Sequence, residues 1–149
     1  MSDLTMNPNL PDPEIDAVFF EGVTAKRLFA WVFDVVVTLV LSILFSIFTL
    51  GIGFFLFPLV WILISFVYRT LTIAAGSATW GMRIAGIELR DRDGLHLDTG
   101  YAFMHTLIYS ITMATVLFQI LSAGLMLTTR YKQGIADIFL GTTAINRPL

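Results

Sequence analysis

The sequence predicts an all-α membrane protein with a two-helix transmembrane hairpin, a third hydrophobic helix and a small cytoplasmic β-hairpin. The 149-residue chain is 56% hydrophobic and 13% charged, with a mean hydropathy of +0.81. A soluble domain of this size could not bury so much apolar surface. The apolar residues gather in three long segments, and a short stretch before the third alternates polar and apolar residues. We therefore expect one membrane domain, over residues 23–149.

Residues 1–22 differ in composition from the rest of the chain. They contain three prolines and five acidic residues, and they lack Lys and Arg. A secretory signal would need a basic segment before a short apolar core, which this stretch does not have. We expect a flexible acidic tail.

The first two apolar segments, residues 28–50 and 54–75, are each long enough for one bilayer crossing. A crossing helix needs about 20 residues at about 1.5 Å each. The Gly-Ile-Gly sequence at residues 51–53 separates the segments and carries no charge. This arrangement predicts two antiparallel helices joined by a tight turn.

Asp34 is a charged residue inside the first apolar segment. At about 100° per residue it lies on nearly the same helix face as Arg27. The face continues in a stripe of small hydroxyl residues, Thr38, Ser42 and Ser46. Such a stripe is typical of a helix-packing seam, which accounts for the hydroxyls but not for the carboxylate. Because a carboxylate at this depth costs at least about 2.5 kcal/mol unless it is paired or hydrated, we expect Asp34 to have a partner.

Arg69 is the expected partner, because it is the only charged residue in the second segment. A hairpin that turns at residues 51–52 brings positions 34 and 69 to the same level. We predict a direct Asp34–Arg69 ion pair, with Arg27 as a nearby charge. A structural role for the pair is favoured, and a role in transport stays open.

The segment between the second and third apolar stretches has a period of two. Apolar residues alternate with polar ones over residues 87–90 and 95–98, and Asp93-Gly94 between them is a typical hairpin turn. Residues 141–145 are also strand-like. We predict a water-side β-hairpin, with residues 141–145 as a third strand of the same sheet.

The third apolar segment, residues 102–128, has two possible placements. The positive-inside rule places the N-terminus and the β-hairpin in the cytoplasm. A third crossing would then put Arg130 and Lys132 outside, against that rule. A bent, re-entrant helix avoids this conflict if its backbone groups bond within the protein. The sequence leaves both placements open. The candidate bend points are Gln119, Ser122 and Gly124.

Three short segments occur in a fixed order: RLFAWVFD at residues 27–34, ATWGMRIAGIELRDRDG at 78–94 and RYKQGIADIFLGTTAI at 130–145. They resemble the motifs of the RDD family of small prokaryotic integral membrane proteins, which is named for an Arg and two Asp. The resemblance covers roughly residues 22–147. It implies that the family's charged residues are Arg27, Asp34 and Asp137. The central motif corresponds to Thr79, Gly81, Arg83 and Gly86.

Two positions depart from the family pattern. Met82 stands where the family commonly has Lys, and Ala136 stands where it commonly has His before the last Asp. The second departure argues against a proton relay between a His and Asp137. For the family, transport has been suggested, including ion–proton antiport for some members.

The residues themselves give no indication of an enzyme, a metal site or a cofactor. His96 and His105 have no second ligand at metal-binding spacing. We expect His96 to lie on the β-hairpin and His105 at the membrane interface. A net charge of −2 without a basic stripe gives no indication of nucleic-acid binding. The expected function is a component of small-ion or solute transport, for a cation or proton, acting as a homo-oligomer in the bacterial inner membrane. The alternative is a non-catalytic accessory subunit that docks on a larger membrane complex.

Overall fold

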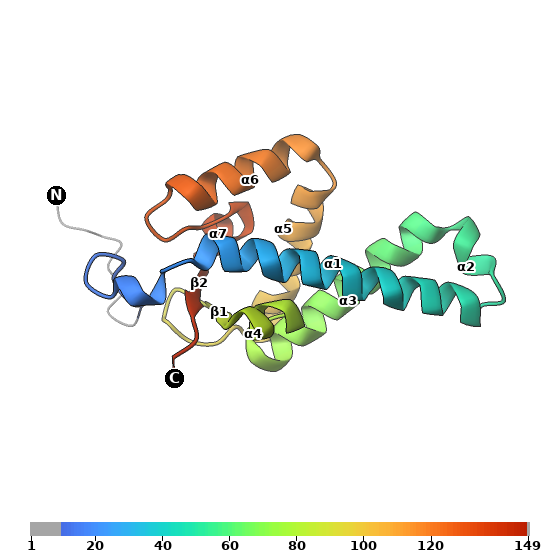
Figure 1. Ribbon diagram of the computed structural model, residues 1–149, viewed down its shortest axis with the longest axis horizontal. Coiled ribbons are helices and arrows are strands. Elements are labelled where there is room, and N and C mark those ends of the chain that lie inside the picture. The colour runs from blue at the N-terminus through green and yellow to red at the C-terminus, as the bar shows by residue number, and fades with distance from the viewer. Residues whose placement is uncertain (1–9, 149) are drawn as a thin grey trace.

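The computed structural model describes residues 10–148, and its longest feature is an antiparallel helix hairpin. Helix α1 (Val23–Phe48) leads through the short α2 (Ile52–Phe55) into α3 (Phe57–Gly76). In Figure 1, α1 and α3 run side by side, and the tip of the hairpin at α2 extends beyond the other elements. Within the described residues, α1 and α3 are the two helices long and apolar enough to cross a membrane. The predicted pair of long apolar helices is confirmed.

Local backbone chemistry sets the turn between α1 and α3. Leu50 and Gly51 have positive φ angles of 56° and 87°, a conformation that Gly adopts at little cost and Leu rarely adopts. Pro58 lies in the first turn of α3, where a missing backbone N–H costs nothing. The chain therefore reverses without a charged residue.

The small hydroxyl residues of α1 form a buried seam. Thr38, Ser42 and Ser46 are all buried. The Ser42 and Ser46 hydroxyls donate to backbone carbonyls one turn earlier, at 2.7 and 2.8 Å. From α3, the Trp61 indole N–H donates to the Thr38 hydroxyl at 3.2 Å. The seam thus buries polar groups whose hydrogen bonds stay within the hairpin.

The sheet pairs two segments far apart in the sequence. Strand β1 (Ile87–Arg90) lies antiparallel to β2 (Thr143–Asn146), with Ile87 opposite Asn146 and Arg90 opposite Thr143. Between α3 and β1, the chain forms the short helix α4 (Trp80–Ala85). The strand-like character of residues 141–145 is therefore confirmed within β2.

The predicted β-hairpin is wrong, because residues 95–98 do not form a strand in the described backbone. The Asp91 carboxylate accepts hydrogen bonds from the backbone N–H groups of Asp93 and Leu95, at 2.8 and 2.9 Å. The Leu97 N–H then donates to the Ser77 hydroxyl at 2.8 Å. Side chains therefore take the backbone donors that a second hairpin strand would have used, and β2 pairs with β1 instead.

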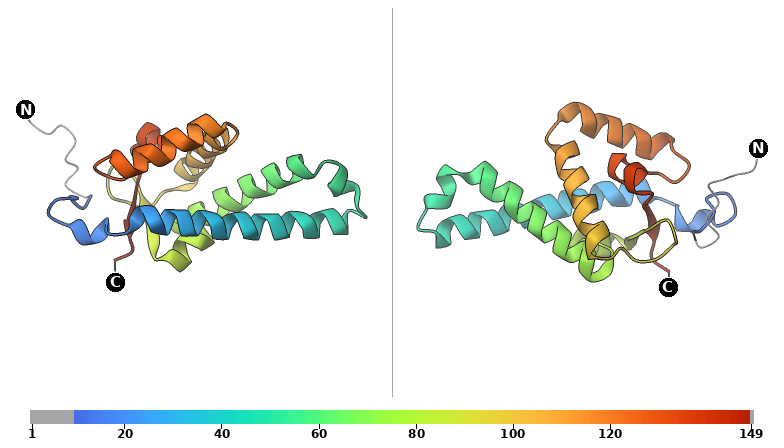
Figure 2. Two further views of the ribbon diagram at one scale, coloured as in Figure 1. Left: turned by 45° about the horizontal axis from the view of Figure 1, so that its top comes forward. Right: turned by 180° about the vertical axis from the view of Figure 1, so that it is seen from behind.

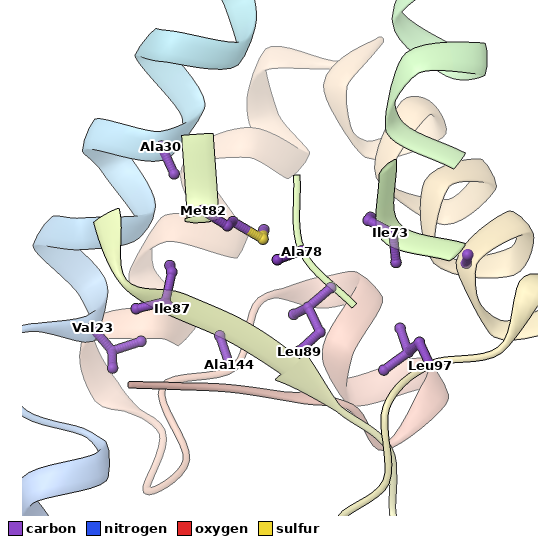
Figure 3. Packing of buried hydrophobic residues seen from close by; sticks show 10 residues of the cluster. Val23, Ala30, Ile73, Ala78, Met82, Ile87, Leu89, Leu97 and Ala144 are labelled. Carbon is purple, nitrogen blue, oxygen red and sulfur yellow. The ribbon is translucent and has the colours of Figure 1, made fainter. Parts of the chain in front are cut away.

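A compact apolar core lies at the base of the hairpin, where α1, α3, α4 and the sheet meet. Figure 3 shows the buried apolar side chains of this core packed around strand β1. Ile87 and Leu89 are fully buried, and Ala144 of β2 lies beside them. The buried members of the core are Val23, Ala30, Ile73, Ala78, Met82, Ile87, Leu89, Leu97, Ala102 and Ala144.

The third apolar segment consists of two helices, α5 (Thr99–Met113) and α6 (Val116–Thr128), bent by 118° at the break. Figures 1 and 2 show α6 lying over the base of α1, followed by the short α7 (Ile135–Leu140). The break falls at residues 114–115, so the predicted bend points at Gln119, Ser122 and Gly124 are wrong. The Gln119 side chain instead donates to the Met113 carbonyl at 2.6 Å, which satisfies an open carbonyl at the end of α5.

The described part of the predicted tail contacts the rest of the molecule. The 3₁₀ helix η1 (Ala17–Phe19) precedes α1, and the Asn146 amide donates to the Val18 carbonyl at 2.8 Å. The Lys132 ammonium donates to the Phe20 carbonyl at 2.9 Å, and Arg130 forms an ion pair with Asp12 at 2.9 Å. Residues 1–9 of the predicted tail lie outside the described residues.

Candidate functional site

A cavity of about 760 Å³ lies at the base of the hairpin, between α1, α3, α5, α6 and α7. Most of its wall is apolar, with Leu28 and Trp31 from α1 and Met126 and Leu127 from α6. Charged and titratable side chains reach the same wall from five different segments. They are Arg27, Asp34, Arg69, His105, Lys132 and Asp137.

Asp137 is the most enclosed of these charges, with a side chain that is 0% exposed. It lies in the first turn of α7, and one carboxylate oxygen is 2.7 Å from Nη1 of Arg27. The other oxygen accepts from the Thr142 hydroxyl at 2.8 Å and lies 2.8 Å from Nε2 of His105. Burial raises the pKa of Asp137, but the Arg27 charge and the hydrogen bonds from His105 and Thr142 outweigh it and hold this pKa below its ordinary value. Arg27 and Asp137, two of the residues implied by the family resemblance, are therefore a buried ion pair.

His105 was expected at the membrane interface, and the structure places its side chain inside the protein. It is 1% exposed and approaches Asp137 from α5. Because an ionised carboxylate can only accept hydrogen bonds, Nε2 of His105 is the donor in this contact. Ala136 stands at the position before Asp137 where the family commonly has His. In this chain a histidine contacts Asp137 from 32 residues earlier in the sequence, at His105. The sequence offered no local signal for it.

Asp34 is hydrogen-bonded to three neutral donors. The Tyr68 hydroxyl donates at 2.7 Å, the Thr79 hydroxyl at 2.5 Å and the Gly81 backbone N–H at 2.9 Å. Asp34 is 7% exposed, so these three bonds replace water around the buried carboxylate. Gly81 is needed for this approach, since a Cβ there would lie 2.3 Å from the Ala30 carbonyl oxygen of α1.

The predicted Asp34–Arg69 ion pair does not form: across residues 10–148, no Lys or Arg nitrogen comes within 4.0 Å of the Asp34 carboxylate. Charge alone pointed to Arg69, because it is the only charged residue in the second apolar segment. A tyrosine, a threonine and a backbone amide can satisfy the same carboxylate without a counter-charge. Two of these donors come from α4, which hydropathy does not place near Asp34.

The central motif builds the connection from α3 to β1. Thr79 caps α4 by accepting from the Met82 N–H at 3.2 Å, and Gly86 ends this helix with a φ of 75°. The Arg83 guanidinium donates to the carbonyls of Ala78 and Thr72, at 3.2 and 3.0 Å. The motif thus positions two of the three groups that hold Asp34.

Arg69 has a different environment from the other buried charges. It is 7% exposed, and its guanidinium carbon lies 3.8 Å from the centre of the Tyr109 ring. In the part of the chain that the structure describes, no acceptor within hydrogen-bond distance and no carboxylate within 4.0 Å contacts it. Arg69 therefore presents an unpaired positive charge at the cavity wall.

The same residues do not form a metal site. No group of three or more His, Asp or Glu side chains, taken from residues 10–148, could hold a metal ion. The cavity has a largely apolar wall that also carries charged side chains.

Comparison with protein-family models gives a match to the RDD family over residues 22–141. The chain belongs to the RDD family. No curated protein and no solved structure matches it. In this RDD protein, the first Asp is held by the central motif, while Arg27 and the second Asp pair directly. The family's Arg27, Asp34 and Asp137 thus belong to two polar clusters, and all three line the same cavity.

Proposed function

We propose that this RDD protein is a component of a membrane transport system and that the cavity at the base of the hairpin is its solute-binding site. The observation that supports this proposal is the gathering of five charges on one largely apolar wall. Charged side chains within membrane helices are costly and commonly mark solute or ion pathways. A concave apolar site with a few convergent polar groups is also the usual form of a small-molecule site.

The proposal includes a placement in the membrane. We propose that α1 and α3 cross the bilayer, with the cavity in the half nearer the start of α1. Strand β1 follows α3 closely, and β2 near the end of the chain pairs with it. Asn146 of β2 also accepts from the Lys26 ammonium of α1 at 2.7 Å. These contacts support our proposal that the start of α1, the end of α3 and β2 lie on one side of the membrane, with α5 and α6 re-entering it.

We propose that this side faces the cytoplasm, as the positive-inside rule favours, and that the membrane is a bacterial inner membrane. Two crossing helices and one re-entrant pair are too few to enclose a path across the bilayer. We therefore propose a homo-oligomer or a larger membrane complex, in which the protein has no enzymatic activity.

Flux through reconstituted liposomes tests the proposal. The purified protein is reconstituted with opposed gradients of sodium, potassium, protons or small organic anions, and internal pH and membrane potential are followed with dyes. We expect flux that Arg69→Gln reduces at least about tenfold, because this side chain presents its charge to the cavity. Arg130→Gln, whose charge pairs with Asp12 outside the cavity, is the matched control and should retain flux.

The accessory hypothesis predicts a different result from the same preparation. Absence of flux in all gradients, together with a stoichiometric partner that copurifies from native membranes, would replace the transport proposal by the accessory one.

A further inference from the structure

Four of the five charges on the cavity wall already have partners. Arg27 pairs with Asp137, and Asp34 accepts three hydrogen bonds from neutral donors. Lys132 donates to the Phe20 carbonyl. Arg69 remains without such a partner among the described residues. With neutral His105, the wall has three cations and two carboxylates, and the excess charge is positive.

The guanidinium of Arg69 is held in a defined orientation. Its carbon lies 3.8 Å from the Tyr109 ring centre, a close cation–π contact. The contact places the Arg69 charge over the ring, and Nε of the guanidinium has no hydrogen-bond partner among the described residues. A planar guanidinium matches a carboxylate through two parallel hydrogen bonds. The preorganised group therefore favours a planar oxyanion over a cation.

The rest of the wall is suited to a hydrocarbon body. Leu28 and Leu127 are 63% and 74% exposed, and they lie on α1 and α6 at the cavity. Met113 and Met126 add flexible apolar surface. The volume of about 760 Å³ lies within the range of about 300–1,000 Å³ that is usual for small-molecule pockets.

We propose that the cavity binds a single-chain amphiphilic monocarboxylate, with its carboxylate on Arg69 and its hydrocarbon chain between α1 and α6. This inference rests on the proposed function for the role of the cavity as a solute site, and it names the solute class. Asp34 and Asp137 lie on the same wall, but their oxygens are engaged by Tyr68, Thr79 and Gly81 and by Arg27, His105 and Thr142. A free cation therefore finds no open carboxylate there.

Quenching of Trp31, which lines the cavity, tests the proposal. The protein with Trp61→Phe and Trp80→Phe is placed in nanodiscs of zwitterionic lipid and titrated with a dibrominated C18 fatty acid. We expect saturable quenching by the acid and only gradual, unsaturable quenching by its methyl ester, which partitions into lipid but has no charge. Arg69→Gln should weaken the saturable phase at least about 30-fold, because the carboxylate loses its buried partner, and Arg130→Gln should leave it unchanged.

A second variant keeps the test informative if Arg69→Gln does not fold. Ala123→Phe places a ring on the cavity wall from α6 and should abolish saturable quenching while Arg69 is intact. Absence of saturable quenching in the folded parent protein would overturn the proposal. Loss of the saturable phase when phosphatidylglycerol is added to the nanodiscs would also overturn it, because an anionic phospholipid would then be the occupant.

The binding assay separates this inference from the transport proposal. Saturable binding without flux in liposomes would contradict transport and retain the ligand class. Cation flux that is insensitive to Arg69→Gln, without acid binding, would retain transport and overturn the ligand class.

Discussion

The tip and the base of the helix hairpin bury polar groups in two different ways. At the tip, the hydroxyls of Ser42 and Ser46 bond to carbonyls four residues earlier in the same helix. At the base, Asp34 accepts from Tyr68, 34 positions away, and Asp137 pairs with Arg27, 110 positions away in the sequence. The tip also exposes large apolar side chains, with Leu50 94% and Phe55 90% exposed, as expected for a lipid-facing surface. The two serine hydroxyls at the tip are thus satisfied within their own helix, whereas the two carboxylates at the base also depend on distant groups that tertiary structure brings to them.

This difference has an energetic consequence. A hydroxyl that bonds to its own helix can be removed without leaving another buried group unpaired. A charge at the base cannot, because its partner stays buried when it is removed. Substitutions should therefore cost much more at the base than at the tip.

The largest expected effect is an all-or-none difference between tip and base in the membrane face from which introduced cysteines can be labelled. The chain has no cysteine, so single cysteines can be labelled without background. Asp93→Cys and Arg147→Cys, which flank the paired strands, should react with an impermeant maleimide only from the cytoplasmic face. Ile52→Cys at the tip should react only from the opposite face. Labelling of positions 93 and 147 from different faces would contradict the re-entrant placement of α5 and α6.

Asp137→Asn should produce the largest loss of stability, about 3–5 kcal/mol, because it leaves Arg27 buried without its counter-charge. Adding Arg27→Gln should recover part of the loss, and Asp93→Asn on the exposed turn is the control. Thermal unfolding in mild detergent measures the parent, both single variants of the pair, the double variant and the control. A strictly additive double mutant would contradict the ion pair.

The pH dependence of the stability that Asp137 contributes follows from the lowered pKa of its carboxyl group. A folded-state pKa below the unfolded value contributes stability that is fully present above the unfolded pKa, near 3.9. That contribution is lost as the pH falls through the folded-state pKa. The difference in stability between the parent protein and Asp137→Asn should therefore be constant from pH 5 to 8 and shrink only at more acidic pH.

Asp34→Asn should have an intermediate effect, about 1–3 kcal/mol, because an amide nitrogen would face groups that donate hydrogen bonds. The structure and the sequence-based ion pair predict different outcomes for the double variant with Arg69→Gln. The hydrogen bonds of Asp34 predict additivity, since Arg69 makes no contact with its carboxylate, whereas an ion pair predicts partial recovery. A double-mutant cycle measured by thermal unfolding distinguishes the two.

Ser46→Ala at the tip should have the smallest effect, about 0.6 kcal/mol or less, which is typical of side-chain hydrogen bonds within membrane proteins. Its hydroxyl donates only within α1, so no buried partner on another helix is lost. Thermal unfolding under the same conditions measures the change. A loss as large as that of Asp137→Asn would contradict the distinction between tip and base.

The sequence alone determined the features that depend on neighbouring residues. Hydropathy and glycine placement predicted the paired helices α1 and α3, and helical periodicity placed Thr38, Ser42 and Ser46 on one buried face. Three ordered motifs predicted membership of the RDD family. These features follow from repeat distances within a single helix or from short contiguous segments, which the sequence displays directly.

Only the tertiary structure decided which groups satisfy the buried charges. Charge complementarity predicts an Asp34–Arg69 pair, but the carboxylate is held by neutral donors from α3, from α4 and from the N-cap of α4. Strand β1 was likewise predicted to pair with the adjacent residues 95–98. Its partner in the structure is β2, which lies 53 residues beyond β1. The physical reason is that hydrogen bonds of similar energy are available from many donors. Which donor reaches a buried acceptor is set by packing, and packing at the base joins segments from the whole chain.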